Sequence, residues 1–415
     1  MLVSLKYGTS SLELELADKN YQGTLEPSSV EPAEDPLEET RRALASPIGS
    51  KRLKDLASAE DKVVILASDI TRPSPSHILI PPLLDELNIA GVKDEQIKII
   101  FGLGIHRQQT EAEMIKLVGE EVYRRVECID HDGDNCQWVG VTSRGTPVMV
   151  FREVLKADLI IGTANLEYHY FAGFSGGAKS LCPGVCSRET IKNNHQLLLQ
   201  PGAVAGNLKG NPVREDIEEA AGMVGVDFIA NAILSSNKEL VRVVAGDVRE
   251  AHLEGTRYID RIFGVQISEL ADIVITSPGG FPKDIDLYQA FKAMDNARMA
   301  VKEGGIIITA AECSDGLGED SFASAFEDGL TPEELVAELE EKFILGRYKA
   351  SRMADIHLKH EIYLVSNLAE EIREQLFLPT HSSLEEALKE ALGEVGKEAK
   401  ILVMPYGIST LPRLK

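Results

Sequence analysis

Residues 97–125, IKIIFGLGIHRQQTEAEMIKLVGEEVYRR, hold the pattern that decides the fold. The first six residues are a short apolar run of the kind that forms a buried strand, and a loop over 102–109 follows it. Thr110 and Glu113 then have the spacing of a capping box, which predicts that a helix begins there. A buried strand, a loop and a helix in this order form the repeating unit of an α/β protein.

The same unit recurs along the chain. Further short apolar runs predict buried strands: KVVILAS (62–68), ADLIIG (157–162), ADIVITS (271–277), GGIIITA (304–310), IYLVS (362–366) and KILVMP (400–405). Because these runs are continuous and alternate with helical stretches, we expect mainly parallel sheets flanked by helices on both faces. Alternating apolar and polar residues predict β-hairpins over the first 18 residues and over 226–247.

A chain of 415 residues is too long for one ordinary core, which indicates two domains. An amphipathic helix is predicted over about 248–263, and the next buried strand follows it. We therefore expect an N-terminal α/β domain, residues 1–266, that binds cofactor and metal, and a C-terminal α/β domain, residues 267–415, that closes over the substrate. The active site is expected in the cleft between them.

The composition of the chain argues against some classes of binding partner. The chain has 66 acidic and 43 basic residues, a formal charge of -23, which would repel a nucleic-acid backbone. Its five cysteines form no C-x-x-C pair, as is usual in a reducing compartment. The sequence shows neither an apolar run long enough to cross a bilayer nor a secretory signal at its start, so we expect a cytoplasmic protein without a membrane or nucleic-acid partner.

Chemically unusual side chains follow the predicted strands, where ligands collect in open α/β sheets. Strand 62–68 is followed by Asp69, Thr71 and Arg72, and strand 97–102 by His106. Strand 157–162 leads into HYFAGFSGGAKSLCPG (169–184), which contains His169 and Lys179, and His195 lies beyond it. In the second half, DLYQAFKAMDN (286–296) places Gln289 and Lys292 on one face of a helix. The combination predicts a functional site.

The sequence contains incomplete matches to three familiar motifs. GFSGGAKS resembles a nucleotide P-loop, but Ala178 replaces its second glycine and about ten residues separate it from the strand. In GLGIHR, Arg107 stands where a dinucleotide fingerprint has its third glycine. Cys182 and Cys186 have a spacing that metal ligands can use, but no second pair completes a site. The glycine-rich loop can still present backbone N–H groups to a phosphate.

The whole set resembles the nickel-dependent lactate racemase family. The motifs that carry the resemblance are SDITRP, GIHR, EYHYFAGFSGGAK, NNHQ, GGFPKDIDLYQAFKAMDNA and AECSDGLGED, and they span most of the chain. The resemblance implies racemisation or epimerisation of a 2-hydroxy acid by reversible hydride transfer to a nickel-pincer nucleotide. This cofactor is a pyridinium mononucleotide with thioamide and thiocarboxylate arms that grip nickel. Proteins that make the cofactor are implied as partners.

The resemblance also implies roles for residues. Lys179 would tether the cofactor as a thioamide. His195 would be a nickel ligand, a role for which an imidazole is well suited. His106 and His169 would exchange the hydroxyl proton of opposite enantiomers. The expected cofactor-binding residues are Asp69, Thr71, Ser175, Gly176 and Gly177 with Lys179, and the expected substrate-binding residues are Arg72, Tyr288, Gln289 and Lys292.

One departure from the family concerns the substrate. Family members that act on lactate are expected to place a tryptophan from the C-terminal domain over the site, but the single tryptophan here, Trp138, lies in the first half. The corresponding region offers Arg347, Tyr348 and Lys349, which leaves a larger or dianionic hydroxy acid open. Two other functions also stay open: a nickel-free lyase with Lys179 as Schiff-base or phosphate-binding lysine, and a non-catalytic nucleotide- or metal-binding protein.

Overall fold

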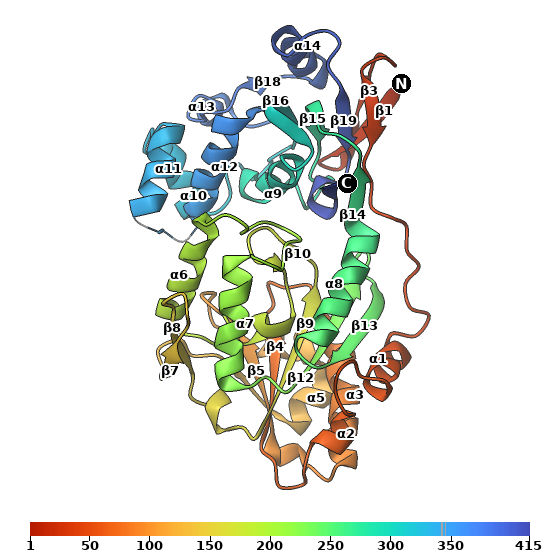
Figure 1. The fold of residues 1–415 in the computed structure, drawn as a ribbon, viewed down its shortest axis with the longest axis vertical. Coiled ribbons are helices and arrows are strands. Elements are labelled where there is room, and N and C mark those ends of the chain that lie inside the picture. The colour runs from red at the N-terminus through yellow and green to blue at the C-terminus, as the bar shows by residue number, and fades with distance from the viewer. Residues whose placement is uncertain (342, 345) are drawn as a thin grey trace. The chain divides into compact units, whose positions relative to one another are not determined.

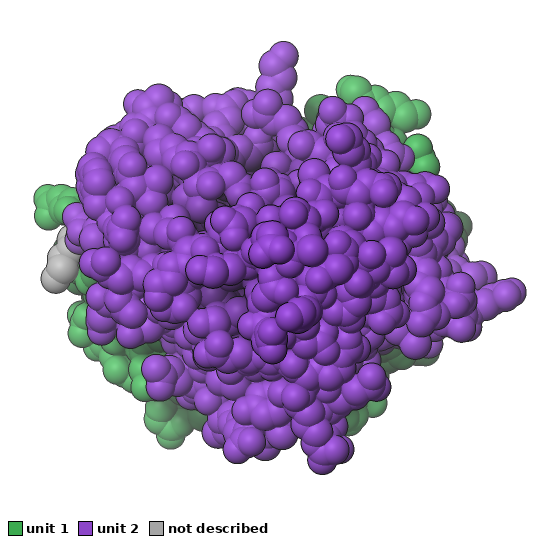
Figure 2. Space-filling view, turned by 90° about the horizontal axis from the view of Figure 1, so that it is seen from below, with its two compact units in different colours: residues 1–28, 261–415 green, residues 29–260 purple. Residues whose placement is uncertain are grey.

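The computed structural model describes residues 1–341, 343–344 and 346–415. The chain forms two compact units, coloured separately in Figure 2. Unit 1 combines residues 1–28 with 261–415, and unit 2 is residues 29–260. The sequence had suggested a division near residue 266 with the entire N-terminal part in one domain. The structure differs in grouping the first 28 residues with the C-terminal half.

Unit 2 is built on a six-stranded sheet in the order β13-β12-β9-β4-β5-β6 (Figure 1). Strands β12 and β13 are antiparallel, and the other neighbouring pairs are parallel. The strands of the unit are β4 (Val63–Ser68), β5 (Ile97–Gly102), β6 (Glu127–Asp130), β7 (Cys136–Val141), β8 (Pro147–Phe151), β9 (Leu159–Leu166), β10 (Tyr168–His169), β11 (Gly173–Phe174), β12 (Phe228–Leu234) and β13 (Leu240–Gly246). Its helices are α1 (Pro36–Ala45), α2 (Leu53–Leu56), α3 (Ser76–Ile89), α4 (Glu111–Val118), α5 (Glu120–Arg125), α6 (Arg188–Gln196), α7 (Pro212–Val224) and α8 (Glu250–Phe263), whose end passes into unit 1.

The stretch 97–125 folds largely as predicted. Strand β5 is followed by a loop and by α4, and Thr110 and Glu113 form both hydrogen bonds of the capping box. The helical stretch is nevertheless two helices, because Gly119 between them has φ +86°. A left-handed backbone at this position interrupts the ladder of helical hydrogen bonds.

Unit 1 contains a second six-stranded sheet, in the order β18-β17-β16-β15-β19-β3, in which all neighbouring pairs are parallel (Figure 1). The strands of the unit are β1 (Leu2–Tyr7), β2 (Ser10–Glu15), β3 (Tyr21–Thr24), β14 (Gly264–Ile267), β15 (Ala271–Thr276), β16 (Val301–Ala310), β17 (Glu361–Val365), β18 (Thr380–His381), β19 (Ile401–Met404) and β20 (Leu411–Leu414). Its helices are α9 (Leu287–Ala297), α10 (Asp320–Glu327), α11 (Pro332–Glu341), α12 (Tyr348–Lys359), α13 (Glu370–Arg373) and α14 (Leu384–Glu394).

The N-terminal segment belongs to unit 1 for two reasons. Strand β3 pairs in parallel with β19 and forms an edge of the sheet, with Leu25 N–H donating to the Val403 carbonyl at 2.7 Å. The hairpin β1–β2 covers one face of the same sheet, and its Leu5 and Leu14 pack into a core with Ile306. Burying these apolar side chains stabilises the hairpin on the C-terminal sheet.

The fold class predicted from the sequence is confirmed: both units are α/β with mainly parallel sheets. Each continuous apolar run forms a strand, and both predicted hairpins are present. Opposite faces of the unit 1 sheet have separate cores, one under α9 and α12 and the other under α14 and the β1–β2 hairpin. Among the described residues, no helix has the combination of length and apolar character needed to cross a membrane.

Candidate functional site

The first part of the site lies where β4 and β5 end side by side. Ser68 and Gly102 are register partners at the ends of these parallel strands, so the loops that follow them leave the sheet at the same edge. Asp69 Oδ2 lies 2.6 Å from His106 Nδ1. The hydroxyl and the amide of Thr71 both donate to Asp69 Oδ1, at 2.5 and 2.8 Å. Three predicted residues therefore form one hydrogen-bonded group.

This group holds a carboxylate in ionised form. Asp69 is buried, and burial by itself would raise its pKa, but the hydrogen bonds from His106 and Thr71 outweigh that effect and lower the pKa below its ordinary value. An ionised Asp69 accepts the Nδ1–H of His106 and leaves Nε2 as the proton-accepting nitrogen of the ring. The orientation of His106 thus leaves Nε2 able to accept a proton.

The second part of the site is arranged around Phe171, a residue that the sequence analysis did not single out. Its ring centroid lies 4.5 Å from that of His169 and 5.0 Å from that of His195. Lys179 Nζ lies 6.0 Å from the same ring centroid. One buried aromatic side chain therefore brings together the two histidines and the lysine that the glycine-rich stretch had suggested.

The pKa values of His169, Lys179 and His195 reflect their burial and their closeness to one another. The pKa of His169 lies well below its ordinary value because of burial first and then the positive charges of Lys179 and Arg72, among others. Burial, followed by the charges of Arg214 and Arg72, lowers the pKa of Lys179 to about 7. Burial and then Lys179 lower the pKa of His195 to about 3. The imidazoles of His169 and His195 are therefore neutral at pH 7, and a large share of the Lys179 amine is neutral too.

Helix α7 holds the loop over residues 171–174, which lies between His169 and Lys179. Arg214 is fully buried, and its guanidinium donates to the carbonyl of Ala172, at 3.2 Å, and to that of Phe174. Asn211 Nδ2 donates to the Phe171 carbonyl at 2.8 Å. Buried charged groups are uncommon, and Arg214 is an anchor of the loop that the sequence did not reveal. Because Arg214 lies within an ordinary amphipathic helix, the sequence pattern does not distinguish it from a surface arginine.

The backbone of the glycine-rich turn lies close to neighbouring parts of unit 2. The N–H of Ser175 donates to the Glu167 carbonyl, and that of Gly177 donates to Asn231 Oδ1, at 2.9 and 2.8 Å. Two of the three amides predicted to bind a phosphate thus have acceptors within the chain. The turn then enters a short 3-10 helix, Gly177–Ser180, and not the long helix that follows a P-loop.

Replacing Gly177 by alanine is expected to destabilise unit 2 by about 1–3 kcal/mol. Gly177 has φ +58°, and an added Cβ would lie 2.7 Å from Cδ2 of the His252 ring. Urea unfolding followed by circular dichroism measures the change. Gly222→Ala is the matched control, since this helical glycine has open space around it and should tolerate or gain from the substitution. Equal stability of both variants would contradict the steric argument.

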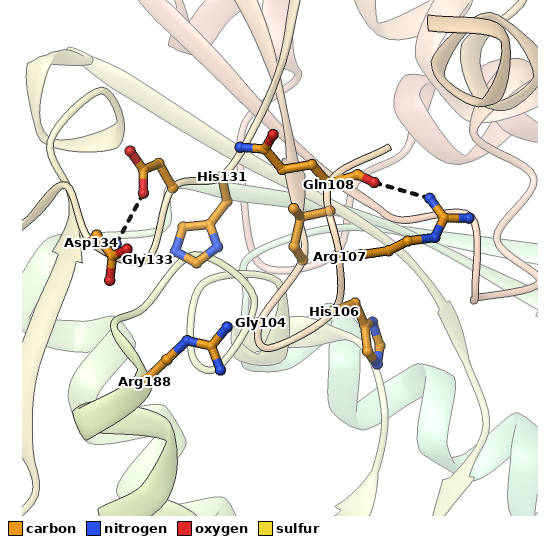
Figure 3. A pocket seen from close by; sticks show the side chains of 10 residues that line it. Gly104, His106, Arg107, Gln108, His131, Gly133, Asp134 and Arg188 are labelled. Atoms are coloured by element: carbon orange, nitrogen blue, oxygen red, sulfur yellow. Dashed lines mark hydrogen bonds between the residues drawn. The ribbon is translucent and has the colours of Figure 1, made fainter. Parts of the chain in front are cut away.

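A pocket of about 210 Å³ opens beside His106 (Figure 3). It is formed by the loop after β5, by the turn after β6 and by the start of α6, with the lining side chains Leu103, His106, Arg107, Gln108, His131, Asp132, Asp134 and Arg188. His106 is the predicted site residue among them. The guanidinium of Arg107 is tied to Glu113 at 2.7 Å, so this side chain is committed to the cap of α4.

Arg72 lies in unit 2, in the loop after β4, and three further predicted residues lie on unit 1 at the start of α9. Asp286 caps this helix by accepting the N–H of Gln289 at 2.6 Å. Lys292 Nζ donates to Gln289 Oε1 at 2.7 Å, which confirms that the two side chains share a face. Lys349 Nζ lies 3.1 Å from the ring centroid of Tyr288. The structure thus brings Tyr288, Gln289 and Lys292 together on unit 1, with Lys349 as a neighbour.

Comparisons with known proteins cover nearly the whole chain. Residues 7–206 match the family model of the lactate racemase N-terminal domain, and residues 267–411 match that of the lactate racemase C-terminal domain. The lactate racemase of Thermoanaerobacterium thermosaccharolyticum is 35% identical over 427 residues, covering 100% of this chain and 99% of the relative. The lactate racemase of Lactiplantibacillus plantarum is 32% identical over 421 residues, covering 99% of each.

Solved structures agree with the sequence comparison. The lactate racemase apoprotein from Thermoanaerobacterium thermosaccharolyticum has a TM-score of 0.91 with 34% identity, covering 100% of both chains. A Thermotoga maritima protein has a TM-score of 0.63 with 17% identity, covering 94% of this chain and 100% of its own, which shows a shared fold.

Proposed function

The chain belongs to the lactate racemase family of isomerases, and from that premise we propose that it interconverts the enantiomers of a 2-hydroxy acid. Lactate, on which the similar enzymes are named to act, or a larger or dianionic analogue is the proposed substrate. The observation that carries the proposal is the presence of two imidazoles, His106 and His169, in one unit, with Arg72 in the loop after β4 close enough for its charge to act on His169.

Each of these residues has a role in the proposed reaction. Arg72 binds the substrate carboxylate through charge-assisted hydrogen bonds. His106 accepts the hydroxyl proton of one enantiomer at Nε2, and the Asp69 carboxylate stabilises the imidazolium that forms. His169 exchanges the hydroxyl proton of the other enantiomer. Burial is the main reason for the low pKa of His169, and an anionic substrate at Arg72 also offsets part of the positive charge that lowers this pKa further.

The loop residues fit a tethered nickel-pincer nucleotide. His195 is held as a neutral imidazole, the form that coordinates a divalent metal, and is proposed as the nickel ligand. Lys179 has a pKa of about 7, so its amine is available for the covalent link. Gly176 has φ +67° and an added Cβ would lie 2.7 Å from Asn231 Oδ1, so the turn packs closely against Asn231 at a position that only glycine fits. When bound, the cofactor would supply an electrophilic ring carbon able to accept the Cα hydrogen of the substrate as hydride.

The test of the proposed function is a racemisation assay on protein from a host that makes the cofactor, since we propose that cofactor-making proteins load this chain. Single enantiomers of several 2-hydroxy acids are followed by chiral chromatography, and intact mass reports the adduct. Formation of both enantiomers by adduct-bearing protein is expected. Adduct-bearing, nickel-containing protein that racemises none of them would overturn the proposal.

Asp69→Asn is expected to lower kcat for racemisation by about 10²- to 10⁴-fold while leaving the adduct in place. The amide cannot supply the negative charge that stabilises the imidazolium of His106, and its NH₂ group can turn the ring to the wrong tautomer. Initial rates on cofactor-loaded protein measure the effect. Asp85→Asn, an exposed carboxylate on α3, is the control and should keep the wild-type rate. A wild-type rate of racemisation in Asp69→Asn would show that His106 is not the base.

A second candidate function is favoured by one observation. A lysine with a pKa near 7 is also suited to form a Schiff base with a carbonyl compound. Borohydride reduction of cofactor-free protein with a 2-keto acid would trap such a link on Lys179 as a stable mass increase. We expect no trapped product, and stoichiometric trapping with turnover would favour the lyase over the racemase.

A further inference from the structure

Helix α6, which carries the proposed nickel ligand His195, is fixed at both ends by buried polar side chains. The buried residues of this helix are Thr190, Ile191 and Asn194. Near its start, Thr190 Oγ1 donates to the Pro147 carbonyl at 2.7 Å and accepts the Met149 N–H at 3.0 Å. Near its end, Asn194 hydrogen-bonds to α7. Because hydrogen bonds are directional, contacts at both ends fix the rotation of α6 about its axis.

The partner of Asn194 is Asp216, a carboxylate in the interior of unit 2 on the neighbouring helix α7 (Figure 1). Asn194 Nδ2 donates to Asp216 Oδ2 at 2.8 Å, and Asp216 Oδ1 accepts the Thr142 hydroxyl at 2.5 Å. Both Asn194 and Asp216 are 0% exposed. Loss of the bond from Asn194 would leave a buried acceptor oxygen unpaired, so the link between the two helices is costly to break.

A purely structural role for Asp216 would be to hold the turn between β7 and β8 onto α7. That turn has two further ties to the same helix. The amide and hydroxyl of Ser143 donate to Glu219 at 2.7 and 2.6 Å, and Arg144 pairs with Glu215 at 2.6 Å. The turn is therefore tied to α7 without Asp216. Its attachment does not explain why the second oxygen of this carboxylate bonds to α6.

Helix α7 also holds the aromatic ring that lies against His195. Asn211 and Arg214 of α7 donate to carbonyls of the loop that contains Phe171. The Phe171 ring centroid lies 5.0 Å from that of His195. One helix thus fixes both the turn that carries this imidazole and the ring beside it. Partners of this kind, which do not bind a metal themselves, set the direction of the ligand that does.

We propose that Asp216 is a positioning residue for nickel binding: through Asn194 it fixes the last turn of α6 and so directs the imidazole of His195 toward the metal. This inference rests on the proposed function and adds a residue to its metal site. Asp216 acts through the backbone of α6 and takes no part in the chemistry. Loss of such a supporting contact typically weakens metal binding by about 10- to 100-fold.

The main experiment compares two variants that each remove one hydrogen bond from Asp216. Asn194→Leu removes the bond from α6, and Thr142→Val, the matched control, removes the bond from the turn. Cofactor-loaded proteins are mixed with excess chelator, and nickel that stays with the protein is measured over time. We expect Asn194→Leu to release nickel about 10- to 100-fold faster than wild type, and Thr142→Val to release it at the wild-type rate.

Two further measurements on these proteins exclude other causes of nickel loss. Intact mass should show the Lys179 adduct in both variants, so that a faster release does not reflect a missing cofactor. Urea unfolding of both variants measures the stability that each hydrogen bond contributes, which separates nickel release from a general loss of stability. Equal rates of nickel release in the two folded variants would overturn the role of Asp216.

A reciprocal double variant tests the pair itself. Asn194→Asp combined with Asp216→Asn exchanges the amide and the carboxylate between the helices and keeps a hydrogen bond between them. We expect this protein to release nickel far more slowly than Asn194→Leu and close to the wild-type rate. Release as fast as in Asn194→Leu, from a folded double variant, would contradict the proposal.

Hydrogen exchange provides a measurement that depends on neither nickel nor cofactor. In cofactor-free wild type, the amides of residues 194–196 should exchange as slowly as those of α7, because Asp216 holds the last turn of α6. The same amides should exchange at least about 10-fold faster in Asn194→Leu than in Thr142→Val. Rapid exchange of this turn in wild type would overturn the proposal even if the leucine variant failed to fold.

His195→Ala separates this inference from the function on which it rests. If cofactor-loaded His195→Ala kept nickel as firmly as wild type, His195 would not be the ligand, and both the proposed metal site and the role of Asp216 would fall. If His195→Ala lost nickel while Asn194→Leu kept it, only the role of Asp216 would fall, and the metal site would stand.

Discussion

Lys179→Ala protein, isolated from a cofactor-producing host, is expected to have the mass of the bare polypeptide and no detectable racemisation. The wild-type amine has a pKa of about 7, so a large share of it is neutral and nucleophilic at neutral pH and can form a covalent link. Alanine removes the amine and with it the link, while the loop stays anchored by Arg214 and Asn211. Intact-mass spectrometry measures the adduct, and nickel analysis of the same sample measures the metal.

The control for this experiment is Lys192→Ala. Lys192 is exposed on α6, three residues before His195, and its replacement should leave both adduct and nickel at the wild-type level. An adduct that persisted in Lys179→Ala would show that the tether is another residue. The proposed function would then need a different anchor, although the roles of the histidines would be unaffected.

Replacing either His106 or His169 by asparagine should lower the rate of racemisation by about 10²- to 10⁴-fold. The reason is that a full cycle needs a proton acceptor for one enantiomer and a proton donor for the other, so one remaining imidazole cannot complete it. Both variants should keep the adduct, because neither residue is the proposed anchor or metal ligand. Chiral chromatography from each pure enantiomer gives the rates, and His77→Asn, an exposed residue on α3, is the control.

Isotope retention tests the chemistry that the histidines serve. Substrate labelled with deuterium at Cα should give product of the opposite configuration that keeps the label, since the hydrogen is proposed to leave and return as hydride. Fast exchange of the label with solvent would indicate proton abstraction from carbon instead. In that event the histidines could still be essential, but as carbon bases.

Much of the candidate site was visible in the sequence because its residues follow predicted strands. Asp69 and His106 come after neighbouring parallel strands, and their loops had to leave the sheet at one edge. The residues that complete the arrangement were not visible. Phe171 resembles any core aromatic, yet its ring lies close to His169, Lys179 and His195. Arg214 occupies an unremarkable position in α7, yet it holds the loop between His169 and Lys179.

The sequence by itself determined the α/β class, the buried strands and the capped helices, because these depend on patterns of neighbouring residues whose energetics are local. The tertiary structure decided what depends on partners far along the chain. Strand β3 has only four residues and no apolar pattern, and it becomes a strand because the backbone of β19 offers it hydrogen bonds. For the same reason no local pattern shows the contact between Lys349 on α12 and the ring of Tyr288 on α9, because the two residues lie far apart along the chain.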